Sequence, residues 1–139
     1  MSQDNNTTRE HPEYTFDPQK VLNITYHLLV EQGERSCSDG MACVMLTADE
    51  KRCAVGQWLP KEMAYRCDQE GYSLPGTIAG VYRDEYPKTC SFLEAHKDLL
   101  LDLQHAHDDR SSEKPFTQSW PMNISKVAKK YGLEDPTST

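Results

Sequence analysis

The chain has 139 residues, with 15 Lys and Arg against 22 Asp and Glu, which gives a net charge of −7. This length is typical of one domain, and the acidic balance argues against non-specific binding to nucleic acid, which needs a basic surface. No apolar run approaches the roughly 20 residues that span a bilayer, and the first ten residues lack the apolar core of a signal peptide. We therefore expect a cytoplasmic protein without membrane contact.

The first third of the chain predicts a tail followed by a helix. Residues 1–16 are polar and have no helical or strand periodicity, which predicts a flexible N-terminal tail. Asp17 followed by Pro18 is typical of an N-cap and the first helical position. Apolar residues then recur at helical spacing as far as Gly33, which suits a left-handed C-cap, so a helix is expected between these two points.

The middle of the chain contains signals for strands, a helix and a turn. Two short apolar runs, residues 42–46 and 52–56, flank a polar linker, which predicts a β-hairpin after the first helix. Pro60 is well placed to open a short helix that runs through Cys67. Residues 74–77, Leu-Pro-Gly-Thr, place proline and glycine as a type II turn does.

The last third predicts two further helices. Ser91 and Glu94 form a capping box, in which each side chain satisfies a free backbone donor at a helix start. The amphipathic stripe that follows runs to His107 over four turns. A final helix is expected over residues 121–131, because its apolar residues share one side and a glycine suited to a C-cap follows.

These elements predict an α+β fold class. We expect a mainly helical single domain, residues 17–133, with about four helices and one β-hairpin inserted after the first helix. Residues 134–139 are expected to form a flexible C-terminal tail.

The five cysteines are an odd number in a chain without an export signal, which predicts free thiols in a reducing cytosol and not a disulfide framework. None of them lies in a Cys-x-x-Cys pair, and no group of Cys and His has zinc-finger spacing. We therefore expect mostly buried, inert thiols, with Cys37 in its polar loop as the most reactive one.

Several motifs together resemble a family of small uncharacterised proteins that is common in phages and prophages. The matching segments are Lys-Arg-Cys-Ala-Val-Gly (51–56), Tyr65, Glu70-Gly71, Leu-Gln-x-x-His-Asp (103–108) and Tyr-Gly-Leu (131–133). The resemblance spans about residues 19–133. The chain departs from the family at two places, since it has Cys-Val-Met at 43–45 instead of Cys-x-Tyr, and Gln-Trp-Leu at 57–59 instead of Cys-Leu-Ile.

The resemblance implies a phage-type accessory protein in the cytoplasm of a bacterial host cell. Such proteins often act by binding, so we expect a non-enzymatic inhibitor that needs neither cofactor nor metal. Its partner would be a host defence protein or a small anionic, nucleotide-like ligand. The expected contact surface centres on the hairpin and the turn nearby, at Lys51, Arg52, Trp58, Glu70 and Gly71.

Two other function classes stay open. His107-Asp108 has the letters of the metal-binding HD phosphohydrolase dyad, and an alternative site would combine this pair with Gln104 and a helical histidine, His27 or His96. We favour a structural role for the pair, because His107 ends the apolar stripe and Asp108 can cap the following loop. An acidic DNA mimic is a weaker alternative, since the acidic residues are interspersed with basic ones.

Overall fold

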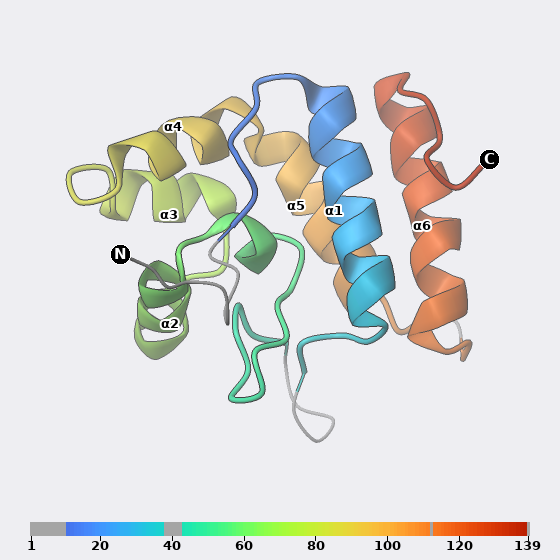
Figure 1. Ribbon diagram of the computed structural model, residues 1–139, viewed down its shortest axis with the longest axis horizontal. Helices are drawn as coiled ribbons and strands as arrows, with labels where there is room; N and C mark the ends of the chain where they lie inside the picture. Colours follow the sequence, from blue (N-terminus) through green and yellow to red (C-terminus); the bar gives the residue numbers. More distant parts are fainter. Residues whose placement is uncertain (1–10, 38–42, 112, 139) are drawn as a thin grey trace, which may run out of the picture.

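The computed structural model describes residues 11–37, 43–111 and 113–138. Over these ranges the chain forms helices and no strand, so the predicted α+β fold class is wrong. The elements are α1 (Pro18–Gln32), the 3-10 helix η2 (Gly56–Trp58), α2 (Lys61–Glu70), α3 (Pro75–Val81), α4 (Pro87–Ala95), α5 (Lys97–Asp108) and α6 (Phe116–Tyr131). Helices α1, α5 and α6 pack against one another, α3 packs against α4, and α2 lies at the periphery (Figure 1).

Helix α1 follows the prediction closely, because its ends are set by local chemistry. The carboxylate of Asp17 accepts a hydrogen bond from the N–H of Gln19 at 2.9 Å, which makes Asp17 the N-cap. At the other end Gly33 has φ +80°, and its N–H donates to the C=O of Leu29. Glycine adopts this left-handed conformation without steric cost, so the helix ends where the sequence predicts.

The predicted β-hairpin over residues 42–46 and 52–56 is not formed, although the chain reverses direction there. Residue 42 lies outside the described residues. Between the two predicted strands, the described residues make one isolated antiparallel bridge, from Leu46 to Arg52, around a tight turn at residues 47–51. One bridge does not make a ladder, and the segment is a loop.

Side chains from other elements bind the backbone groups of this segment. The carboxylate of Asp68 accepts from the N–H groups of Met45 at 2.8 Å and Leu46 at 3.1 Å. The amide of Gln32 pairs with both the N–H and the C=O of Arg52, each at 2.9 Å. In the register of the Leu46–Arg52 bridge, the N–H of Met45 would donate across to residue 53, and the carboxylate of Asp68 binds it instead.

The helix boundaries in the second half of the chain differ from the prediction. Helix α4 begins at Pro87, so Ser91 lies inside the helix and not at its start, and the predicted capping box is wrong. The Ser91 side chain lies on the exposed side of the helix. The predicted long stripe is divided at His96, which ends α4 and precedes α5. The turn predicted at residues 74–77 is the start of α3, in which Pro75 is the first helical residue and has the φ that this position requires.

The core lies between the helices and encloses both tryptophans. Trp58 is fully buried, and its indole N–H donates to the hydroxyl of Thr25 at 2.9 Å, so its polar atom is satisfied. Helix α6 begins at Phe116 and not at residue 121, and its added first turn stacks Phe116 on Trp120 with ring centroids 5.7 Å apart.

The packed part of the chain is longer than the predicted domain. Tyr14, which the sequence places in the first tail, donates from its hydroxyl to a backbone carbonyl of η2 at 2.9 Å. Beyond α6, the N–H and C=O of Glu134 both pair with the side-chain amide of Gln19. Residues 1–10 and residue 139, the remaining ends of the two predicted tails, lie outside the described residues.

Candidate functional site

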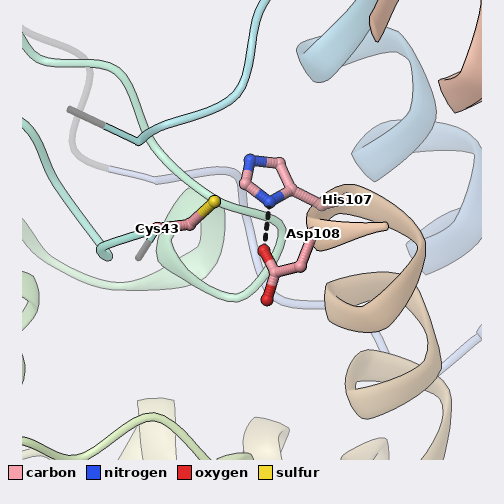
Figure 2. A group of neighbouring side chains, drawn as sticks. All are labelled: Cys43, His107 and Asp108. Atoms are coloured by element: carbon pink, nitrogen blue, oxygen red, sulfur yellow. Dashed lines mark hydrogen bonds and ion pairs between the residues drawn. The ribbon is translucent and has the colours of Figure 1, made fainter. Parts of the chain in front are cut away.

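His107 and Asp108, on which the function classes divide, lie at the C-terminal end of α5 (Figure 2). The His107 ring is fully buried, and its Nε2 atom accepts a hydrogen bond from the backbone N–H of Ser36 at 3.2 Å. A backbone N–H can only donate, so the ring proton of the neutral imidazole lies on Nδ1. Nδ1 in turn donates to Oδ1 of Asp108 at 2.6 Å. Both ring nitrogens therefore have partners within the protein.

Gln104, the first polar residue of the Leu-Gln-x-x-His-Asp motif, extends this network. Its amide nitrogen donates to Oδ1 of Asp108 at 3.0 Å, and its amide oxygen accepts from the N–H of Val55 at 3.0 Å. The three motif residues thus connect α5 to the chain at Ser36 and at Val55. These contacts hold two loops against one helix, which is a structural role for a motif that resembles a catalytic one.

The cysteines differ from the prediction of five free thiols. Cys37 and Cys43 form a disulfide, so the prediction is wrong for these two. Cys53, Cys67 and Cys90 are free and buried, as predicted. Burial raises the pKa of Cys53 and of Cys67 to about 12, so these thiols are protonated and inert at neutral pH.

Among the residues that the structure describes, one group of metal-ligating atoms occurs, at the end of α5. Sγ of Cys43 and one ligand atom each from His107 and Asp108 lie within 4.8 Å of one another (Figure 2). The donor set does not suit a metal, because Cys43 is bonded to Cys37 and the only lone pair of the imidazole accepts from a backbone N–H. His27, the helical histidine of the alternative site, is exposed on α1 and is not part of the group.

A small cleft of about 120 Å³ opens beside this group. Carboxylates of Asp68 and Asp108 line it together with the apolar side chains of Leu74 and Leu101. Burial raises the pKa of Asp68, although two backbone N–H groups bind its carboxylate. Two carboxylates repel an anion, so this cleft does not suit a nucleotide-like ligand.

Two residues of the predicted contact surface lie inside the protein. Arg52 is 3% exposed, and its guanidinium donates to the carbonyls of Gly56 at 3.0 Å and Leu59 at 2.8 Å. Trp58 is fully buried in the core. Arg52 satisfies carbonyls at the two ends of η2, and Trp58 has no exposed surface, so neither side chain is available to a partner.

The other three residues of that surface remain accessible. The ammonium of Lys51 pairs with Asp49 at 3.1 Å and Glu34 at 3.3 Å, and these hydrogen-bonded carboxylates raise the pKa of Lys51. Glu70 is exposed at the end of α2. Gly71, with φ +81°, is the left-handed C-cap of the same helix. The predicted residues therefore fall into a buried pair and an exposed set around α2.

Tyr65 is an exposed aromatic residue that sequence reasoning did not include in the contact surface. It lies in the middle of α2, and 57% of its surface is exposed. Glu62 and Gln69, three residues before and four after it, are exposed on the same helical face. Tyr65 is one of the residues that carry the family resemblance, and a large aromatic on a polar helical face is the signal that could have identified it.

None of the helices in the described part of the chain is both long and apolar enough to cross a membrane. Comparison of the chain with models of protein families, with curated proteins and with solved structures gives no match. The resemblance to the phage family therefore stays a prediction, and the function is inferred from the residues and their geometry.

Proposed function

We propose that this protein is a non-enzymatic accessory protein of the phage type that binds a host protein through the outer face of α2. The observation that carries the proposal is the exposure of Tyr65 at the centre of this face. Tyrosine is enriched at the centres of protein interfaces, because its ring buries a large apolar area while its hydroxyl keeps a polar partner.

The surroundings of Tyr65 suit a protein interface. A helix of ten residues is about 15 Å long, so α2 offers one compact strip. At its first residue, Lys61 pairs with Glu50 of the tight turn at 3.5 Å, which brings the turn that carries Lys51 beside the helix. Glu70 lies at its last turn. The strip therefore has an aromatic centre and a charged rim, the usual anatomy of a contact surface.

The hydrogen bonds of the His-Asp pair support a non-enzymatic role. A general base or metal ligand needs a nitrogen lone pair that is open to the substrate or the ion. In His107 that lone pair accepts from Ser36, and the ring has no exposed surface. The metal-dependent phosphohydrolase alternative therefore receives no support from the geometry.

The charges favour a protein partner over a small anionic ligand. Of the two cations predicted to hold an anion, Lys51 is paired with two carboxylates, and Arg52 donates to buried carbonyls. Binding an anion at this place would require breaking these contacts. A protein partner can instead bury Tyr65 and leave the rim pairs in place.

The test is a binding comparison with a matched control variant. Full-length protein, Tyr65→Ala and Met122→Ala are immobilised and exposed to a bacterial lysate, and retained proteins are identified by mass spectrometry. Met122, on α6, is the control because it is 44% exposed and apolar but lies outside the proposed surface. Exposed substitutions change stability by no more than about 0.5 kcal/mol, so all three proteins should unfold alike.

We expect one specific host protein to be retained by the wild type and by Met122→Ala, and to be lost at least tenfold from Tyr65→Ala. Retention that is equal in all three proteins would contradict the α2 surface. Stoichiometric Mn, Fe or Zn in the purified protein, lost on His107→Gln, would contradict the non-enzymatic role.

A further inference from the structure

The disulfide between Cys37 and Cys43 joins two residues that the backbone already holds together. Directly outside the pair, the N–H of Val44 donates to the C=O of Ser36 at 3.0 Å, and the hydroxyl of Ser36 donates to the C=O of Val44. The N–H of Ser36 is held in turn by the buried ring of His107. These bonds do not involve sulfur, so the two cysteines remain neighbours when the S–S bond is broken, and the bond can form again.

The two sulfur atoms have unequal surroundings. A guanidinium nitrogen of Arg110 lies 3.9 Å from Sγ of Cys43. A cation at this distance stabilises a thiolate and makes Cys43 the better leaving group. The carboxylate of Asp108 lies within 4.8 Å of the same sulfur and opposes this effect, although His107 donates a hydrogen bond to it.

We propose that Cys37 and Cys43 form a reversible thiol–disulfide exchange site for small thiols, independent of the binding function proposed above. The thiolate of a small thiol attacks Sγ of Cys37, the S–S bond breaks, and its electron pair leaves on Sγ of Cys43 beside Arg110. A second small thiol then resolves the mixed disulfide at Cys37. The two small thiols become one disulfide, their two electrons reduce the pair, and two protons are left for the protein thiols.

The exchange is confined to this pair because the remaining cysteines are buried. Cys53, Cys67 and Cys90 are free but buried, and burial raises the pKa of each thiol. Cys37 and Cys43 are only half-buried. In a reducing cytosol, where stable disulfides are rare, a bond of this kind is expected to be transient and to sense the redox state.

The first experiment uses reduced and oxidised glutathione as the probe. Full-length protein is equilibrated in glutathione buffers of different ratio, free thiols are blocked by alkylation, and the modified cysteines are located by mass spectrometry. We expect one disulfide, Cys37–Cys43, that forms and breaks reversibly while the protein keeps a cooperative unfolding transition. Two free thiols at these positions in every buffer, or a bond that glutathione does not reduce, would overturn the proposal.

The second experiment tests the role of Arg110 in the rate of reduction. Arg110→Gln should slow reduction by glutathione about fivefold. This is the factor by which the attraction between two opposite unit charges about 4 Å apart in water would favour a thiolate at Cys43. Arg110→Lys keeps the charge and should restore most of the rate. Arg83→Gln, which removes an exposed arginine from the loop between α3 and α4, should reduce at the wild-type rate. An Arg110→Gln protein that is reduced as fast as the wild type would overturn the assignment of Cys43 as the leaving group.

Discussion

Replacing His107 by alanine should destabilise the protein by about 3 kcal/mol. The ring is fully buried and meets Phe116 edge-on, with centroids 5.7 Å apart. Its removal leaves the buried N–H of Ser36 without an acceptor, which costs about 1–3 kcal/mol, and the lost packing of the ring adds about 1–2 kcal/mol. The change is large because His107 satisfies a donor that water does not reach.

Two conservative variants separate the contributions of the two ring nitrogens. In His107→Gln the amide oxygen can reach the position of Nε2 and accept from Ser36, so about half of the lost stability should return. In His107→Asn the shorter amide can reach only Asp108. The Asp108 side chain is 43% exposed and water can replace its partner, whereas Ser36 is fully buried. Glutamine should therefore restore more stability than asparagine.

Urea unfolding followed by circular dichroism measures these differences directly, provided that the free energy of unfolding falls with urea concentration at the same slope in all four proteins. The expected order of stability is wild type, then His107→Gln, then His107→Asn and His107→Ala. An alanine variant within about 0.5 kcal/mol of the wild type, or an asparagine variant more stable than the glutamine variant, would refute the structural role of the ring.

Three other predictions concern Gly56, with Gly80 as its comparison, Arg52 and Cys53. Gly56→Ala should lower the stability of the protein by more than about 2 kcal/mol, because a Cβ would overlap the carbonyl oxygen of Met45. Gly80→Ala, with open space around it in α3, should raise the stability by about 0.5–1 kcal/mol. Thermal unfolding compares the two variants. Arg52→Met should cost about 2 kcal/mol in urea unfolding, since it leaves buried carbonyls without donors, and an unchanged midpoint would contradict their dependence on Arg52. Cys53, whose pKa is raised to about 12, should react with maleimide at pH 8 only after unfolding; rapid reaction in the folded protein would show that the thiol is accessible.

Local patterns predicted the elements that depend on neighbouring residues. The start and end of α1 follow from Asp17 and Gly33, whose side-chain and backbone chemistry acts within one turn of the helix. Gly132 ends α6 in the same way, with φ +66°. The predicted capping box at Ser91 failed, because the same residues are also compatible with the interior of a helix that begins earlier.

The candidate site was predictable only in part, because burial depends on distant parts of the chain. Lys51 and Arg52 are adjacent and alike in charge, yet one reaches carboxylates at the surface and the other donates to carbonyls inside. The chain enters the core directly after the tight turn, so Lys51 lies near the surface and Arg52 lies inside. The apolar environment of the His107 ring was predicted from its place on the stripe, but its partner Ser36 lies 71 positions earlier and was not foreseen.

The sequence by itself determined that this chain is an acidic, mainly helical protein, because charge and helical periodicity are read from residues near one another. Only the tertiary structure decided that no hairpin forms, since Asp68, remote from the first predicted strand, binds the N–H of Met45 that the next rung of a ladder would use. It also decided that Cys37 and Cys43 pair. Hydrogen bonds and disulfides form between groups that the fold brings within a few ångströms, and residue spacing does not encode that proximity.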